Sequence, residues 1–67
     1  MFDTGIVVIL EIEKGCGIIE SCAIDYFFQS RDVSGGLFSS LLEGQDVEFV
    51  AEIFESGPKA TQVRIVP

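Results

Sequence analysis

Residues 14–21 have the sequence KGCGIIES, in which two glycines open a short apolar segment. The residues before it, TGIVVILEIE at 4–13, form a β-branched run that ends at the turn-forming residues EKG, 13–15. Two apolar runs separated by a short glycine-containing turn are typical of a β-hairpin. We therefore expect residues 4–13 and 16–22 to be its two arms. The unusual feature is that Cys16 and Ile18, both apolar, occupy positions expected to face water.

Turn-forming residues divide the rest of the chain into short segments at regular spacing, which is typical of all-β domains. Residues 24–30, IDYFFQS, are aromatic and strand-like. Residues 31–44, RDVSGGLFSSLLEG, favour a loop with one short helical turn near residues 31–33. Residues 45–55 alternate in polarity and predict a strand with one face made of Val47, Phe49, Ala51 and Ile53 and the other of Asp46, Glu48, Val50 and Glu52.

The last segment, residues 59–66, alternates again after the turn at residues 56–58. Its expected faces are Ala60, Gln62, Arg64 and Val66 on one side and Thr61, Val63 and Ile65 on the other. Five strands in so short a chain hide their edges only by closing on one another. The sequence therefore predicts an all-β fold, a five-stranded antiparallel barrel of the OB type, formed by residues 1–67 as one domain.

The composition limits the cellular compartment and the kinds of partner that we expect for this domain. The chain is 48% hydrophobic, which is enough for it to fold. Two cysteines and no histidine make neither a disulfide framework nor a good zinc site, so we expect a reduced, cytoplasmic protein. The N-terminus has no signal-peptide pattern, and its apolar run is too short to span a bilayer. A formal net charge of −7 repels phosphate backbones and anionic membranes at long range.

The order of these segments resembles the cold-shock domain family across nearly the whole chain. The resemblance is carried by TGIVVILEIEKGCGIIE (4–20), DYFFQS (25–30), LEGQDVEFV (42–50) and GPKATQV (57–63). The matching framework positions are Gly5, Val7, Lys14, Gly15, Gly17, Ile19, Asp25, Phe27, Leu41, Gly44, Val47, Phe49, Gly57, Pro58, Ala60 and Val63. The resemblance implies a five-stranded OB-type barrel that displays aromatic side chains for stacking single-stranded RNA or DNA.

The departures from the family pattern fall on the face that stacks bases. Val8 and Ile9 stand where the family has lysine and an exposed tryptophan, and Leu10 stands at its next aromatic position. Cys16 and Ile18 replace two stacking phenylalanines, and Gln29 and Ser30 replace a histidine and an aromatic residue. Tyr26 and Phe28 replace inward-pointing valines, so we expect them to pack in the core.

What remains of the binding surface is small. The resemblance implies that Lys14, Phe27, Gln29 and Phe38 bind nucleic acid, because Phe27 and Phe38 keep family aromatics. Each base stacked on an aromatic side chain contributes about 1–3 kcal/mol, and an aliphatic side chain offers no comparable platform. We expect weak, non-specific binding of single-stranded RNA or DNA. An equally favoured interpretation is that these residues have no binding role. Phe27 is then an exposed residue inherited from the family, and Lys14 is a solvated turn residue.

A second function class follows from the same substitutions. Ile9, Cys16 and Ile18, with Phe27 and neighbouring Ile6 and Val8, predict an apolar face, and such faces mark association surfaces. The partner is then a second copy or another protein. The competing interpretation is that residues 32–42, DVSGGLFSSLL, fold over this face within one molecule.

Catalytic chemistry is not indicated. The chain has no histidine, no phosphate-binding glycine loop of the strand–helix type and no base beside a serine or cysteine. The oxygen-bearing residues of DVSGG are not spaced for calcium. We expect no enzyme activity, no cofactor and no metal site.

Overall fold

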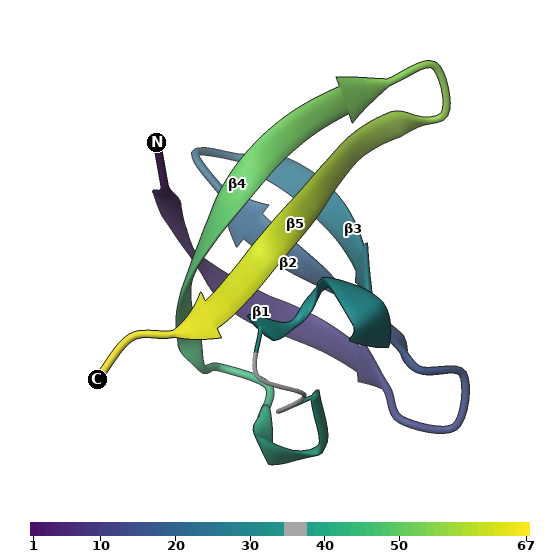
Figure 1. Cartoon of the computed structure of the whole chain (residues 1–67), viewed down its shortest axis with the longest axis vertical. Coiled ribbons are helices and arrows are strands. Elements are labelled where there is room, and N and C mark those ends of the chain that lie inside the picture. The colour runs from purple at the N-terminus through teal and green to yellow at the C-terminus, as the bar shows by residue number, and fades with distance from the viewer. Residues whose placement is uncertain (35–37) are drawn as a thin grey trace.

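The computed structural model describes residues 1–34 and 38–67, and its strands close into a barrel (Figure 1). The strands are β1 (Asp3–Glu11), β2 (Cys16–Ser21), β3 (Ile24–Gln29), β4 (Asp46–Phe54) and β5 (Gly57–Ile65). Between β3 and β4, the described residues include the short 3-10 turns η1 (Ser30–Asp32) and η3 (Phe38–Ser40). The order around the barrel is β1-β2-β3-β5-β4. The predicted five-stranded barrel is confirmed, and so is the predicted β1–β2 hairpin.

One strand pair differs from the expected antiparallel arrangement. β3 and β5 are parallel, with Phe27 opposite Lys59, while the other neighbouring strands are antiparallel. The reason is topological, because strand directions cannot alternate all the way round a closed ring with an odd number of members. One parallel pair is required, and it forms where the β1–β2–β3 sheet meets the β4–β5 hairpin.

The core explains the aromatic substitutions in β3. Tyr26 is 8% exposed and Phe28 is completely buried, which confirms that both pack inside the barrel. The Tyr26 ring lies 5.0 Å from the ring of Phe49, centroid to centroid. Gly17 makes room for Phe28, because a Cβ at Gly17 would lie 2.9 Å from that ring and 2.5 Å from the carbonyl oxygen of Ile9. Any side chain at position 17 would therefore collide both with the Phe28 ring and with the backbone of β1.

A bulge in β1 accounts for its continuous run of apolar residues. Val7 pairs with Ile19 and Ile9 pairs with Ile18, so Val8 is an extra residue in β1. Val7 is fully buried, whereas Val8 and Ile9 are both exposed. The bulge thus places two consecutive aliphatic side chains outside the core.

The alternation expected for the last segment is wrong at one point. Ala60 and Val63 were expected on opposite faces, but both are completely buried. Gln62 has a φ of 51°, and the pairing between β4 and β5 shifts after Glu48, so that two residues of β5 lie opposite one of β4. This bulge reverses the pattern, because each extra residue moves the following side chains to the other face.

The far end of the β4–β5 hairpin also departs from the expected pattern. Ile53 was expected on the core face with Val47 and Phe49, yet it is 73% exposed. The hairpin projects beyond the rest of the barrel at this end, as Figure 1 shows at the upper right. The side chains at this end of the hairpin therefore lie outside the core and form a surface beside β3.

The seam between β1 and β4 is short and is completed by a loop. The two strands pair directly only through Asp3–Ile6 of β1. Beyond that point the Val7 N–H donates to the carbonyl of Gln45 at 3.0 Å, and the Leu10 N–H donates to the carboxylate of Glu43 at 3.0 Å.

In residues 1–34 and 38–67, no helix is long and apolar enough to cross a membrane.

Candidate nucleic-acid interface

Three side chains form a row across the outer face of the first three strands. Ile9 is paired with Ile18, and Ile18 is paired with Phe27. Directly paired residues of antiparallel strands project to the same face, so these three side chains lie next to one another. Ile9 is 45% exposed, while Ile18 and Phe27 are half-buried. We call this row the outer strip. Its two isoleucines lie outside the core, as the sequence predicts.

The neighbouring row contains Cys16 and Gln29, which are also directly paired. Both side chains are half-buried. The Gln29 N–H donates to the carboxylate of Asp32 at 2.9 Å, which fixes the start of η1. Gln29 follows Phe27 by two residues in β3, so it lies on the same face. The structure therefore brings Phe27, Gln29, Cys16 and the outer strip together.

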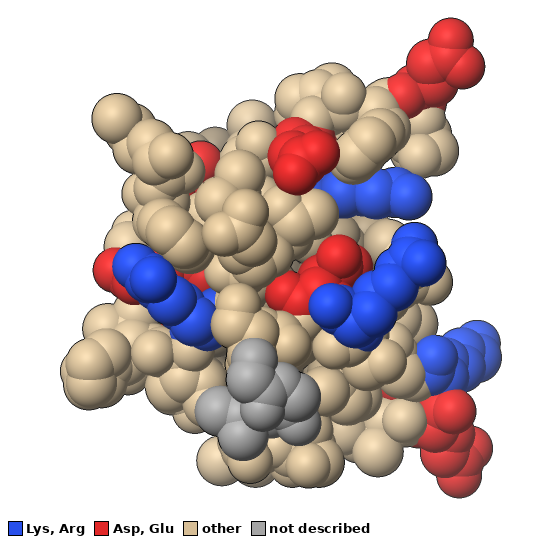
Figure 2. All heavy atoms as spheres, in the orientation of Figure 1, with Lys and Arg blue, Asp and Glu red and all other residues tan. Residues whose placement is uncertain are grey.

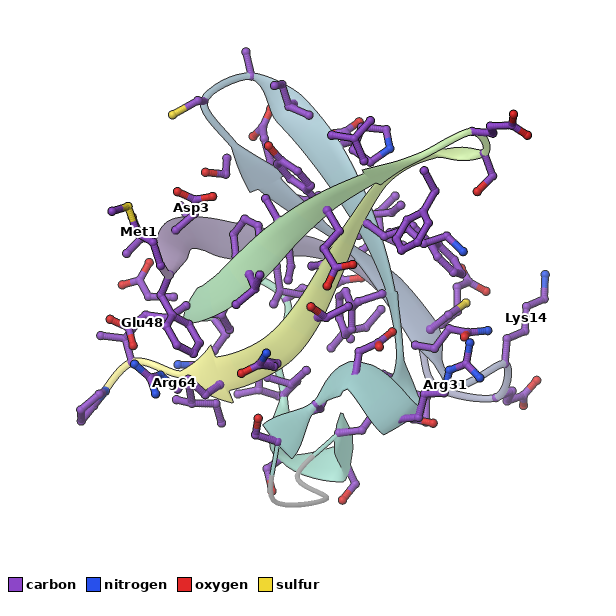
Figure 3. All side chains as sticks on the ribbon, turned by 45° about the horizontal axis from the view of Figure 1, so that its top comes forward. Met1, Asp3, Lys14, Arg31, Glu48 and Arg64 are labelled. Carbon is purple, nitrogen blue, oxygen red and sulfur yellow. The ribbon has the colours of Figure 1, made fainter. Side chains whose placement is uncertain are left out.

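The other two predicted binding residues lie at different places. Lys14 is exposed in the turn between β1 and β2, where its side chain extends into solvent (Figure 3). Phe38 in η3 is half-buried, and its ring meets the ring of Phe28 edge-on at 6.2 Å between centroids. Phe28 belongs to the core, so the Phe38 ring packs against the interior. A role for Phe38 in binding stays a prediction.

The loop that was considered as a cover for this face is only partly described. Its residues 35–37 lie outside the described residues. Leu41, near its other end, is 2% exposed and belongs to the core. Ile9 nevertheless keeps 45% of its surface exposed. Within the described part of the loop, Leu41 therefore packs into the core and not over Ile9, which stays exposed.

A hollow of about 200 Å³ lies beside Phe27, between β3 and the β4–β5 hairpin. We call it the β3–β5 hollow. Its lining residues are Phe27, Gln29, Arg31, Asp32, Phe54, Lys59 and Thr61. The Lys59 ammonium lies 5.2 Å from the centroid of the Phe54 ring, a cation–π distance. Arg31, Phe54 and Lys59 were not among the predicted site residues. Arg31 follows β3 directly in η1, whereas Phe54 and Lys59 come next to Phe27 only when the barrel closes.

Basic side chains are few, and most of them lie on this side of the barrel. The chain has four Lys and Arg residues. Arg64 is bound elsewhere, since its Nε lies 2.8 Å from Glu48 Oε1 and its guanidinium lies 3.7 Å from the Phe2 ring centroid. Figure 3 shows Arg64 beside Glu48 on the opposite side from Lys14 and Arg31. Figure 2 likewise shows basic side chains gathered along the right-hand edge of the molecule.

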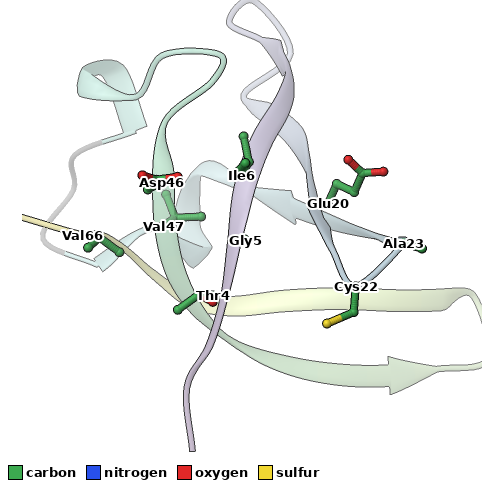
Figure 4. Close-up of a pocket in the computed structure, with 9 residues that line it drawn as sticks. All are labelled: Thr4, Gly5, Ile6, Glu20, Cys22, Ala23, Asp46, Val47 and Val66. Carbon is green, nitrogen blue, oxygen red and sulfur yellow. The ribbon is translucent and has the colours of Figure 1, made fainter.

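A larger hollow, of about 720 Å³, lies near the start of β4 (Figure 4). Its lining residues are Thr4, Gly5, Ile6, Glu20, Cys22, Ala23, Asp46, Val47 and Val66. The charged residues of this lining, Glu20 and Asp46, are both acidic. Carboxylates repel phosphate groups, so this hollow does not suit a polyanion despite its size.

Comparison with known proteins identifies the framework. The family model described as the 'Cold-shock' DNA-binding domain matches residues 3–66. The chain belongs to the cold-shock domain family. It is 36% identical over 66 residues to the Cold shock-like protein CspA of Bordetella pertussis, and equally to the proteins of that name from Bordetella bronchiseptica and Bordetella parapertussis. Each alignment covers 96% of this chain and 98% of the relative. The resemblance inferred from the sequence motifs is confirmed. This cold-shock domain has the fold of a family that binds nucleic acid.

Proposed function

We propose that this cold-shock domain binds single-stranded RNA or DNA weakly and with little sequence preference. The observation that carries the proposal is the position of Phe27, whose half-buried ring lies on the outer face of β3. Gln29 lies on the same face, and Lys59 lies opposite Phe27 on β5. A ring, an amide and a cation in this arrangement provide stacking, hydrogen bonding and phosphate pairing. A cytoplasmic location is part of the proposal, because Cys16 and Cys22 are free thiols.

Low affinity follows from what lies next to Phe27. The outer strip offers two aliphatic side chains, Ile18 and Ile9, in place of rings. Each missing stack removes about 1–3 kcal/mol of binding free energy. The chain's net charge of −7 adds a long-range repulsion that salt screens. Binding is therefore expected to be weak and to discriminate little between bases, and it depends on local cation–phosphate contacts, which weaken as salt rises.

Fluorescence anisotropy of a labelled oligothymidylate of about eight nucleotides, titrated with the protein at low salt, tests the proposal. A mixed-sequence oligonucleotide of the same length measures base preference. The expected result is saturable binding of both probes that fades as salt rises. The absence of binding even at the lowest salt concentration would reject the proposal.

A second candidate function is self-association through β1, with a second copy of the chain as the partner. The observation that favours it is the exposure of Ile6, Val8 and Ile9 on one strand, with Ile12 exposed in the turn that follows. Contiguous exposed aliphatic side chains are typical of association surfaces. Sedimentation equilibrium over a concentration series, with reductant present to prevent a Cys16 disulfide, tests it. A monomer at the highest concentration excludes this candidate.

A further inference from the structure

We propose that the β3–β5 hollow, and not the outer strip, is where this cold-shock domain holds a nucleobase. In this arrangement the base stacks between Phe27 and Phe54, and Arg31 and Lys59 pair with the phosphates beside it. The inference rests on the proposed single-strand binding and specifies its site. Phe27 is one of the matching framework positions of the family, whereas Arg31, Phe54 and Lys59 are not among them.

The distribution of aromatic side chains points to the hollow. The chain has six phenylalanines and one tyrosine, and all seven are described. Tyr26, Phe28 and Phe49 are buried in the core. Phe38 packs on the Phe28 ring, and Phe2 lies against Arg64, on the opposite side of the barrel from Arg31 (Figure 3).

The two remaining rings, Phe27 and Phe54, lie together on the side of the barrel that carries Arg31. Phe27 is half-buried and Phe54 is 46% exposed. They come from different strands, yet both line the β3–β5 hollow. The aromatic surface that this chain keeps for bases is therefore concentrated at one place.

Two of the four basic side chains lie at the same place as these rings. Arg64 pairs with Glu48, and Lys14 lies in the β1–β2 turn. The other two cations, Arg31 and Lys59, both line the hollow. The Lys59 ammonium is held over the Phe54 ring, so a stacking surface and a phosphate-binding charge occur together.

The acidic groups near the hollow are already engaged. The Asp32 carboxylate accepts the Gln29 N–H at 2.9 Å, and the Glu52 carboxylate, on the residue paired with Lys59, accepts the Thr61 hydroxyl at 2.9 Å. The lining contains two cations and one acid, Asp32, and with the neighbouring Glu52 the local charge is close to neutral, while the whole chain carries −7. The hollow is therefore less repulsive to a phosphate than the rest of the surface.

The volume of the hollow limits the size of the ligand that it can hold. Its volume of about 200 Å³ lies below the roughly 300–1,000 Å³ of typical small-molecule sites. A single flat base with its phosphate left at the rim suits this volume. A duplex does not, because its bases are stacked on one another and are not free to enter.

Charge-matched and ring-deleting variants test the site with the oligothymidylate probe at low salt. Phe54→Ala is expected to weaken binding about tenfold, the loss of one stacked base. Arg31→Ala and Lys59→Ala are each expected to weaken it several-fold. Arg64→Ala removes the same formal charge on the opposite side of the barrel and is expected to change the affinity less than twofold. Circular dichroism verifies that each variant is folded.

Amide chemical-shift mapping with the same probe locates the contact independently. We expect the largest shifts at Gln29, Lys59 and Thr61 and small shifts at Ile9. Wild-type binding with Phe54→Ala unaffected and shifts centred on Ile9 and Ile18 would overturn the inference while leaving the proposed function intact. A wild-type protein that fails to bind at low salt would overturn both.

Discussion

Phe27 of β3 lies opposite Lys59 of β5 in the parallel pairing that joins these two strands. The two residues are far apart in sequence, and barrel closure is what makes them neighbours. Because Phe27 is also paired with Ile18, it stands at the boundary between an aliphatic strip and a hollow that contains both cations and rings. The binding properties proposed for this domain follow from that boundary.

Adjacent phenylalanines of β3 are expected to have opposite roles. Phe28 is completely buried, so Phe28→Ala should lower the free energy of unfolding by about 3–5 kcal/mol. Phe27 is half-buried on the outer face, so Phe27→Ala should lower it by much less and should instead weaken oligonucleotide binding by about tenfold. Urea denaturation and anisotropy, measured on both variants, separate the two effects. Equal losses of stability would contradict the assignment of these residues to opposite faces.

Restoring a ring to the outer strip is expected to increase affinity. Ile18 lies between Ile9 and Phe27, so Ile18→Phe would place a second ring directly beside Phe27. We expect the dissociation constant for oligothymidylate to fall about tenfold, in line with one added base stack. Ile24→Phe is the matched control, because Ile24 is exposed at the other end of β3. If both variants bind like the wild type, missing rings are not the reason for low affinity.

Gly17 is expected to be intolerant of any side chain. A Cβ there would lie 2.5 Å from the Ile9 carbonyl oxygen and 2.9 Å from the Phe28 ring, so backbone and core have to shift. Gly17→Ala should therefore destabilise the barrel by about 1–3 kcal/mol, which thermal unfolding measures. Ser39→Ala, at an exposed position in η3, serves as the control and should leave the melting temperature nearly unchanged.

Self-association through β1 is expected to respond to salt in the opposite sense from nucleic-acid binding. Two copies that each carry −7 repel one another, and salt screens this repulsion, so a dimer formed through β1 strengthens as salt rises. Ile9→Ser should weaken such a dimer. Ile53→Ser, at an isoleucine that is exposed on the β4–β5 hairpin, should not. Analytical ultracentrifugation at two salt concentrations distinguishes these outcomes, and a dimer equally weakened by both substitutions would argue against β1 as the interface.

The sequence predicts those features of the molecule that depend on neighbouring residues. The hairpin around Gly15, the turn near Arg31 and the burial of Tyr26 and Phe28 all follow from local patterns and from the family motifs. The exposed apolar positions of the outer strip are likewise visible in the replacement of rings by Ile9 and Ile18.

The features that the sequence does not predict depend on how the strands meet. The Gln62 bulge has no local signal, since glutamine rarely adopts a positive φ, and it reverses the expected faces of β5. Lys59 and Phe54 come next to Phe27 only after the β4–β5 hairpin is placed against β3. The candidate hollow is therefore a product of barrel closure, which a segment-by-segment interpretation does not contain.

The salt dependence of oligonucleotide binding tests the central claim most directly. The claim is that a few rings and three cations, Lys14, Arg31 and Lys59, bind single strands on a barrel that otherwise repels them. Three phosphate contacts predict a slope of about −2 in a plot of log affinity against log salt concentration, with binding lost near physiological ionic strength. Micromolar or tighter binding at about 0.15 M salt, or an affinity that does not change with salt, would contradict the claim.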